Sequence, residues 1–195
     1  MVGMEHDIDF LQLRDFAETT AMRAAELIRA RRAELVAGDG IAAHTQTKSS
    51  AVDPVTEVDT ATEEFITRTI REIRPGDGLL GEEGASFDGT TGVRWIVDPI
   101  DGTVNFLYGI PDYAVSIGAE YDGRLVAGAV VNVVRRQVYA AAAGAGATVA
   151  TADGTRSSLR CGEQDDPALS LVATGFGYDA QPVSYTHLRA HETKA

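Results

Sequence analysis

The chain has 195 residues, which is enough for one sizeable hydrophobic core or for a portion of a larger core built from two halves. Hydrophobic residues make up 44% of it, as is ordinary for a globular protein. Its formal net charge of −12 argues against nucleic acid as a partner, because phosphate backbones are bound by basic surfaces. A phosphate substrate is not excluded, since a bound metal ion can reverse the local sign of the field.

The first predicted element is a long amphipathic helix over residues 10–35, where apolar side chains recur at helical spacing. Arg29, Arg31 and Arg32 would place positive charge at its C-terminal end, where the helix dipole favours it. A glycine-containing loop is expected next, over residues 37–46.

A second helix is expected over residues 57–73. Thr56 would be its N-cap, and Asp59 would lie in its first turn, where a negative charge is favourable. Pro75 and Gly76 follow directly and are typical of a helix end.

From residue 79 onward the pattern changes to short strands separated by turn signals. Strands are predicted over residues 79–80, 93–97, 113–121, 124–134, 137–143 and 169–173, with a further small hairpin within residues 148–160. Glycine-containing turns are expected at Asp122-Gly123, at residues 144–147 and at Asp153-Gly154. Two helices followed by an antiparallel run of strands form an α+β pattern.

The final residues, 183–195, do not fit the preceding pattern. They have no consistent period, turn locally basic in an acidic protein, and hold two of the four histidines, His187 and His191. We therefore expect residues 183–195 to be a non-native tail, and residues 1–182 to form one domain that is incomplete.

The cysteine content and the distribution of apolar residues indicate the cellular compartment. Cys161 is the single cysteine, so an internal disulfide is excluded and a reducing compartment is the simplest interpretation. No apolar stretch approaches the roughly 18 residues that a membrane span needs, and residues 1–10 are acidic, unlike a signal peptide. The sequence thus predicts a cytoplasmic protein that does not associate with a membrane.

Two aspartates at the end of a predicted strand carry the strongest functional signal. Asp98 and Asp101 follow the apolar residues 95–97, and Gly102 and Thr103 come next. A strand end is rigid, so the two carboxylates can hold a divalent metal. Gly102 lets the backbone approach an anion closely, and a turn or helix start after it would offer free N–H groups to phosphate. These features point to a metal-dependent phosphate enzyme, whereas a strand followed by an Asx turn is the structural alternative.

Two further polar segments precede this one. Residues 81–84 place Glu82 and Glu83 at the tip of a turn after a short strand, and residues 53–59 lie at the start of the second helix. Taken alone, the first segment is better explained as a solvated acidic loop, and the second as a loop that caps a helix, which need not exclude a function.

These three segments, in this order, resemble the inositol monophosphatase family. The motifs are residues 53–59, 81–83 and 95–106, and the resemblance covers roughly residues 10–180. It implies a layered αβαβα sandwich of the inositol monophosphatase/fructose-1,6-bisphosphatase type, of which this chain would hold the N-terminal α+β half and the start of the second half. Members of the family also carry a late Trp-Asp pair whose aspartate binds metal, but Trp95 is the single tryptophan here.

The resemblance implies a magnesium-dependent, lithium-sensitive phosphomonoesterase, commonly a homodimer. By resemblance, Glu82, Asp98 and the backbone carbonyl of Ile100 would hold one Mg²⁺. Asp98 would bridge to a second ion that Asp101 also holds. Magnesium prefers such oxygen ligands and keeps several of its waters.

The remaining roles also come from the resemblance. Thr103 together with Asp59 would orient and help deprotonate the attacking water, because a hydroxyl can relay a proton to a nearby carboxylate. The backbone N–H groups of Gly102 and Thr103 would hold phosphate oxygens. Lys48, near the outer metal, and Asp53 are weaker assignments.

Substrate choice is predicted from the residues after the Asp-Gly-Thr motif. Val104, Asn105 and Phe106 look most like the inositol phosphatase branch, so the expected reaction converts myo-inositol 1-phosphate to inositol and phosphate. Hydrolysis of histidinol phosphate is the alternative within the superfamily. From another class, the chain could be a catalytically inactive or regulatory relative, associated with RNA polymerase, that binds rather than hydrolyses.

Overall fold

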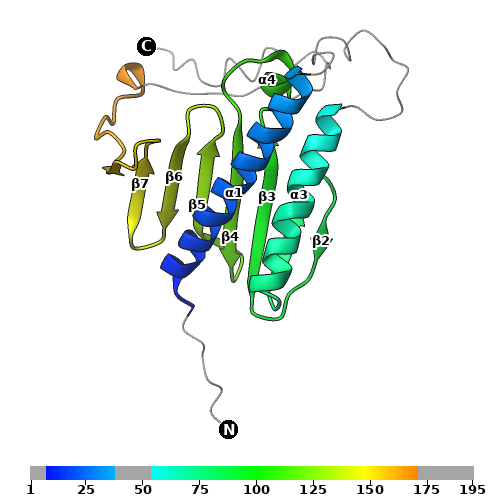
Figure 1. Ribbon diagram of the computed structural model, residues 1–195. Helices are drawn as coiled ribbons and strands as arrows, with labels where there is room; N and C mark the ends of the chain where they lie inside the picture. The colour runs from blue at the N-terminus through cyan, green and yellow to red at the C-terminus, as the bar shows by residue number, and fades with distance from the viewer. Residues whose placement is uncertain (1–7, 38–53, 171–195) are drawn as a thin grey trace, which may run out of the picture. The chain divides into compact units, whose positions relative to one another are not determined.

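The computed structural model describes residues 8–37 and 54–170. The chain divides into two compact units, Met1–Arg160 and Cys161–Ala195, which are described separately. The first unit holds two long helices and a mixed sheet (Figure 1), which confirms the α+β class predicted from the sequence. None of the described helices combines the length and the apolar character that crossing a membrane requires.

An eight-stranded sheet forms the centre of the first unit, in the order β2-β1-β3-β4-β5-β6-β7-β8. β1 and β3 pair in parallel, and the other neighbouring strands pair antiparallel. The strands are β1 (Gly78–Gly81), β2 (Ser86–Phe87), β3 (Val93–Asp101), β4 (Ala114–Tyr121), β5 (Arg124–Asn132), β6 (Gln137–Ala142), β7 (Gly146–Ala150) and β8 (Arg156–Leu159).

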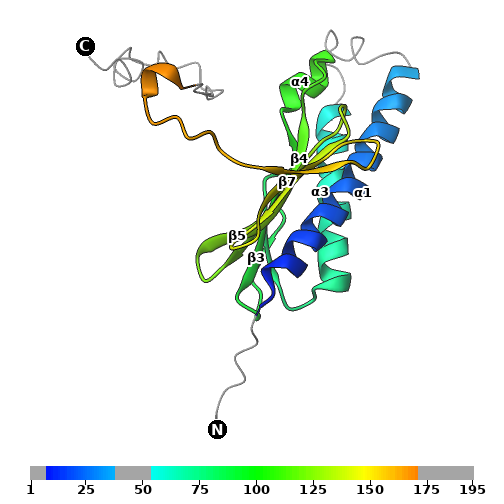
Figure 2. The same cartoon turned by 90° about the vertical axis from the view of Figure 1, so that its left-hand side faces the viewer.

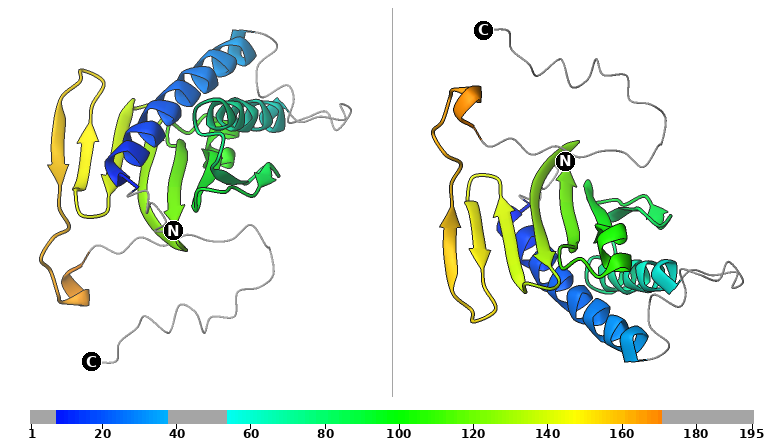
Figure 3. Two further views of the ribbon diagram at one scale, coloured as in Figure 1. Left: turned by 90° about the horizontal axis from the view of Figure 1, so that it is seen from below. Right: turned by 90° about the horizontal axis from the view of Figure 1, so that it is seen from above.

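Two helices, α1 (Phe10–Ala37) and α3 (Pro54–Ile73), cover one face of this sheet (Figure 2), and the views along the vertical axis show both on the same side (Figure 3). α1 packs on β4, β5 and β6, whereas α3 packs on β3 and on α1. The short helix α4 (Thr103–Tyr108) follows β3 directly.

Small side chains let α1 lie close to the sheet. Its buried positions follow the helical period and are mostly alanine: Leu13, Ala17, Thr20, Ala21, Ala24, Ala25 and Ile28. The helix begins after Asp9, whose carboxylate accepts a hydrogen bond of 2.8 Å from the Leu11 N–H.

The predicted basic end of α1 is wrong, because the helix continues to Ala37 and no basic residue lies in its last turn. The arginines make other contacts instead. Arg29 donates to the carbonyl of Val133 at 2.8 Å, and Arg31 pairs with Glu34.

α3 begins at Pro54, three residues before its predicted start, so Thr56 lies inside the helix and is not its N-cap. Proline is favoured at the first helical position because its fixed φ suits the helix and it needs no N–H partner there. Asp59 consequently lies beyond the first turn. The buried side chains of α3 include several polar ones: Val58, Asp59, Thr62, Glu63, Ile66, Thr67, Thr69 and Ile70.

Most strands lie within two residues of their predicted bounds. The turn between β4 and β5 is confirmed, with φ of 50° at Asp122 and 74° at Gly123, as a tight hairpin requires. β3 is the exception, because it continues past Val97 to Asp101. Its proline is tolerated because the pairing with β4 shifts register between Asp98 and Asp101.

In the second unit, η1 (Pro167–Leu169) is a single 3-10 turn with exposed side chains. Asp166 caps it by accepting a hydrogen bond of 2.9 Å from the Ala168 N–H. The strand predicted over residues 169–173 is therefore wrong at its first residue, because the proline and the cap fix a turn there. Residues beyond 170 lie outside the described range.

The core lies between the helices and the sheet, and it holds β3 in place. Trp95 is fully buried, and its ring centroid lies 4.8 Å from that of Phe16 on α1. Burying a side chain of this kind stabilises the fold by roughly 1.5–3 kcal/mol. The other large, fully buried side chains include Phe106, Leu13, Ile28, Ile66, Ile70, Leu79, Ile100 and Ile117.

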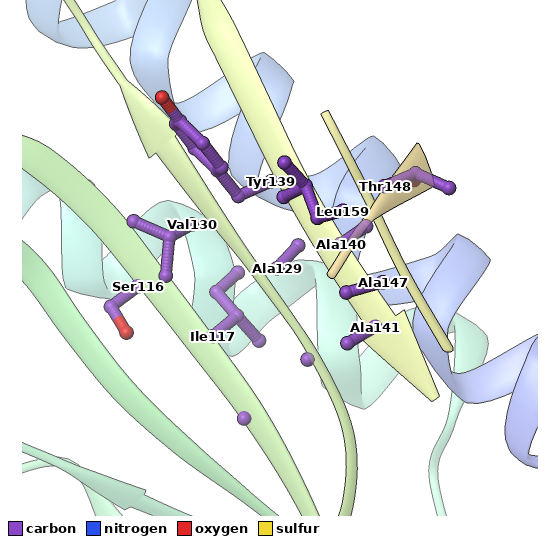
Figure 4. A pocket seen from close by; sticks show the side chains of 12 residues that line it. Ser116, Ile117, Ala129, Val130, Tyr139, Ala140, Ala141, Ala147, Thr148 and Leu159 are labelled. Carbon is purple, nitrogen blue, oxygen red and sulfur yellow. The ribbon is translucent and has the colours of Figure 1, made fainter. Parts of the chain in front are cut away.

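The sheet face turned away from α1 and α3 carries a shallow hollow of about 260 Å³ over β4 to β8 (Figure 4). Its lining is mainly apolar and includes Val130, Tyr139 and Leu159. Among the described residues, no acidic or basic side chain lines it. The groups that could bind metal or phosphate lie elsewhere, at the ends of β1 and β3.

Candidate active site

The parallel pairing of β1 with β3 brings two carboxylates to the same edge of the sheet. Gly81 lies opposite Val97 in the register, and the Glu82 N–H donates to the Val97 carbonyl at 3.1 Å. Glu82 therefore leaves β1 at the level where β3 reaches Asp98. The strands end in the same direction, so residues far apart in sequence become neighbours.

A tight connection follows β3. Gly102 has a left-handed conformation with φ of 91°, and a Cβ at this position would lie 3.2 Å from the Asp112 carbonyl oxygen. Glycine is thus favoured by the left-handed turn, and an added Cβ would also make a tight contact with the neighbouring backbone. The Thr103 hydroxyl donates to the Ile100 carbonyl at 3.0 Å, which ties the start of α4 back to the strand.

Asp98 lies in an unusual electrostatic environment. Burial raises its pKa to about 7, assisted by a hydrogen bond with Glu82 and by the negative charges of Glu82 and Asp101, while the Ile100 backbone opposes the shift. Its Oδ1 atom is buried without a hydrogen-bond partner among the described residues. A buried carboxylate oxygen without a partner is costly, and a cation would satisfy it.

Asp59 on α3 faces the same group of acids. It is 3% exposed, and burial raises its pKa to about 8, followed by repulsion from Glu83, Asp98, Glu82 and Glu63. The pKa of Glu83 is also raised, chiefly by burial and then by its acidic neighbours. None of the interactions that raise these pKa values involves a basic side chain. Such a local excess of negative charge is typical of a metal site without its ion.

Within residues 8–37 and 54–170, no three acidic, histidine or cysteine side chains converge closely enough to form a ready metal cage. The donor chemistry nonetheless fits Mg²⁺, which prefers carboxylate and carbonyl oxygens. Asp98 supplies an oxygen without a partner in this region, and the Ile100 carbonyl can accept a second bond besides that from Thr103.

The structure brings together most of the residues predicted from the sequence. Asp59, Glu82 and Asp98 interact electrostatically, Asp101 acts on Asp98, and Ile100 contacts Thr103. Gly102 precedes Thr103 at the start of α4. The two weaker assignments, Lys48 and Asp53, lie outside the described residues.

Sequence reasoning missed Glu63. Its side chain is 4% exposed, and its carboxylate accepts hydrogen bonds of 2.9 Å from the N–H groups of both Glu83 and Ala85. The available signal was its position one helical turn after Asp59, which places both acids on the buried face of α3.

A model of the inositol monophosphatase family matches residues 9–193. The chain belongs to the inositol monophosphatase family. Its similarity to solved members of the family includes the structure of Mycobacterium tuberculosis SuhB, with a TM-score of 0.74 and 45% identity, covering 90% of this chain and 62% of that one. Inositol monophosphatase-II from Staphylococcus aureus MSSA476 matches with a TM-score of 0.59 and 37% identity, covering 71% of this chain and 49% of that one.

Two curated relatives of the chain carry different names. The inositol-1-monophosphatase SuhB of Mycobacterium tuberculosis is 49% identical over 179 residues, which cover 87% of this chain and 61% of that protein. The Nus factor SuhB of Pseudomonas aeruginosa is 37% identical over 134 residues, which cover 67% of this chain and 48% of that protein. The chain thus spans about three fifths of the length of the mycobacterial relative.

The family match runs into residues 183–195. Those residues lie outside the described range, so their non-native origin stays a prediction, as does the single domain over residues 1–182.

Proposed function

We propose that the chain provides the metal-binding and phosphate-binding portion of a Mg²⁺-dependent phosphomonoesterase. The observation that carries this proposal is the buried Oδ1 of Asp98, which has no hydrogen-bond partner among the described residues and lies beside Glu82 at the end of β3. Family membership supports hydrolysis of a phosphate ester, and the acidity of the site supports a metal cofactor. The preferred substrate is myo-inositol 1-phosphate, the class of substrate in the name of the mycobacterial relative.

The assignment of ligands comes from the family resemblance, and the positions of these oxygens at the ends of β1 and β3 support it. Glu82, Asp98 and the Ile100 carbonyl would hold one Mg²⁺, and Asp98 with Asp101 a second. When bound, the metal would neutralise the phosphate dianion and lower the pKa of a water molecule. The raised pKa of Asp98 supports this assignment, because a buried carboxylate near other acids becomes favourable as an anion only beside a cation.

Thr103 would orient the attacking water. Its hydroxyl hydrogen is directed at the Ile100 carbonyl, so its lone pairs can accept a hydrogen bond from a water molecule. Asp59 would receive the proton, since its buried carboxylate faces the same acidic group and would be ionised once a bound cation offsets the repulsion from its acidic neighbours. The N–H groups of Gly102 and Thr103 would hold phosphate oxygens where α4 begins.

The proposal is tested by measuring phosphate release from myo-inositol 1-phosphate with Mg²⁺ present and after chelation. Histidinol phosphate serves as the competing substrate, and release from it at a higher kcat/KM would assign the chain to that alternative. We expect turnover of the inositol ester that requires Mg²⁺ and is lost in the Asp98→Asn variant. Turnover that is unaffected by chelation would contradict the proposal.

A second function is favoured by one observation, the similarity to the Nus factor SuhB of Pseudomonas aeruginosa. In this alternative the chain binds a partner and does not hydrolyse a phosphate ester. Mg²⁺ binding without turnover of either substrate would support it over the phosphatase. The cytoplasmic location predicted from the composition stays a prediction, as do the lithium sensitivity and the homodimer that the resemblance implies and the absence of a nucleic-acid partner.

A further inference from the structure

We propose that Glu63 is a positioning residue that fixes the turn after β1 (residues 82–85) and so holds Glu82 beside Asp98. The inference rests on the proposed function, because it concerns how a metal ligand is oriented. Glu63 itself would touch neither metal nor substrate. Its role would be to anchor the backbone that carries the ligand.

The anchor is a buried carboxylate with two backbone donors. One oxygen of Glu63, Oε2, accepts from the Glu83 N–H, and the other, Oε1, accepts from the Ala85 N–H, both at 2.9 Å. Hydrogen bonds from an N–H to an ionised carboxylate are about twice as strong as neutral ones. Because the two donors lie two residues apart, both oxygens together fix the position and the direction of the turn.

The carboxylate of Glu63 occupies the space that a side chain at position 81 would need. A Cβ added at position 81 would lie 2.1 Å from Oε2 and 2.5 Å from Cδ of Glu63, closer than side-chain atoms can approach. Gly81 has no left-handed backbone conformation that would by itself require glycine. The absence of a side chain at position 81 is therefore explained by the approach of Glu63.

The rest of the turn has few other anchors among the described contacts. The Gly81 N–H donates to the Ala85 carbonyl at 2.7 Å, and the Glu82 N–H donates to the Val97 carbonyl at 3.1 Å. The Glu82 side chain is exposed, so packing does not fix its direction. The orientation of its carboxylate thus depends on the backbone that Glu63 holds.

Residues that orient a metal ligand without contacting the metal commonly contribute 10–100-fold to metal affinity or activity. In Glu63→Gln, the amide oxygen can still accept one N–H, but the NH₂ group faces the other N–H and cannot accept it. We expect this variant to bind Mg²⁺ about 10-fold more weakly than the unchanged chain. Glu64→Gln is the matched control, because Glu64 is the exposed neighbour on the same helix and its variant loses the same charge.

A second variant removes the anchor without changing any charge. Gly81→Ala places a methyl group where Oε2 of Glu63 lies, so the carboxylate must move away from the turn. Its control is Gly162→Ala, where an added Cβ meets no atom within 4 Å. Glu63→Gln and Gly81→Ala should show the same loss of Mg²⁺ affinity, whereas both controls should bind like the unchanged chain.

Two measurements on the whole chain decide the question. Calorimetric titration with Mg²⁺ gives the affinity, and amide hydrogen exchange gives the protection of the Glu83 and Ala85 N–H groups without any metal. We expect both amides to exchange faster in the two test variants than in the controls. Thermal unfolding of each variant separates this local loss from global unfolding.

The outcomes distinguish the two proposals. If the unchanged chain binds Mg²⁺ and Glu63→Gln and Gly81→Ala bind it equally well, the positioning role is wrong. Equal weakening in Glu63→Gln and Glu64→Gln would also overturn it, since general charge would then be the cause. If the unchanged chain does not bind Mg²⁺, the proposed function fails, and faster exchange at the two amides would still establish the anchor.

Discussion

The indole N–H of Trp95 donates a hydrogen bond of 2.9 Å to the carboxylate of Asp77, and both side chains are buried. The same carboxylate accepts from the Thr91 hydroxyl at 2.6 Å and pairs with Arg74 at 2.8 Å. Asp77 thus joins the end of α3, the start of β1 and the start of β3 at the edge of the sheet remote from the acidic site.

We predict that Asp77→Ala lowers the free energy of unfolding by roughly 3 kcal/mol, because it leaves the buried Trp95 N–H without a partner and breaks a part-buried ion pair. Urea denaturation followed by the fluorescence of Trp95, the single tryptophan, would measure this. Asp88→Ala, at an exposed position, is the control. Equal stability of the two variants would contradict the role of the Asp77 network.

Asp98→Asn should abolish turnover while preserving the fold. The variant removes an anionic ligand that is proposed to contact both metals. Residues that only orient a metal ligand contribute up to about 100-fold to activity, so losing the ligand itself should lower kcat by at least about 100-fold. Without Mg²⁺ the variant should be at least as stable as the unchanged chain above about pH 7, where Asp98 would carry a buried charge. A variant that keeps most of its activity would show that the site is assigned wrongly.

Thr103→Ala should reduce the rate far more than it reduces metal affinity. The hydroxyl is proposed to orient water, and losing such a group lowers kcat by roughly 10²–10⁴-fold. Mg²⁺ binding should stay close to that of the unchanged chain, because the hydroxyl is not an assigned ligand. Thr19→Ala, on the exposed side of α1, is the control. Parallel losses of rate and of metal affinity would argue against the proposed role.

The metal-free chain should lose stability as pH rises from about 4 to about 8. Burial raises the pKa of Asp59 to about 8 and that of Asp98 to about 7, whereas both should titrate near 3.9 in the unfolded chain. Within this window the native state keeps protons that the unfolded state has released. Each retained proton therefore lowers the free energy of unfolding by about 1.4 kcal/mol per pH unit.

Thermal unfolding across this pH range, with and without Mg²⁺, would test the linkage. We expect the melting temperature to fall less steeply with rising pH in Asp59→Asn than in the unchanged chain. Mg²⁺ should raise the melting temperature more at pH 8 than at pH 5. Stability that increases between pH 5 and pH 8 without metal would show that these acids are not held in their neutral form.

Arg32 should link α1 to the segment that carries the Asp-Gly-Thr motif. Its guanidinium lies 4.9 Å from the ring centroid of Phe106 and 5.7 Å from that of Tyr113, and it donates to the Phe106 carbonyl. Arg32→Met should lower the free energy of unfolding by about 1–2 kcal/mol. Arg31→Met, at an exposed position, is the control, and an equal effect in both variants would exclude a specific link.

The periodic elements could be predicted from the sequence because hydrophobic spacing encodes them directly. The long helix from Phe10 and the hairpin at Asp122 are examples. The prediction failed where tertiary contacts override local signals. β3 continues through Pro99 because its partner strand shifts register, and β2 is too short to leave a pattern.

The residues of the candidate site also divide into those that could be predicted from the sequence and those that could not. Asp98, Asp101 and Gly102 lie in one short motif, so their chemistry can be predicted from residue types and spacing. The helical spacing between Asp59 and Glu63 indicates only that both acids share a face of α3, and it does not reveal the partners of Glu63, which lie 20 and 22 residues further along the chain. A buried acid that is satisfied by distant backbone N–H groups becomes visible only in three dimensions.

The parallel pairing of β1 with β3 has a consequence for the order of folding. β4 to β8 follow one another as neighbouring antiparallel strands joined by short turns, so their pairing begins from contacts close in sequence. Every residue of β1 instead pairs with one 16 positions further along the chain, as Gly78 does with Arg94 (94 − 78), so this pairing closes a longer loop than the turns between β4 and β8. A refolding chain would thus acquire its affinity for a divalent ion late, after the hairpins have formed. Binding of the ion would then stabilise the fully folded state.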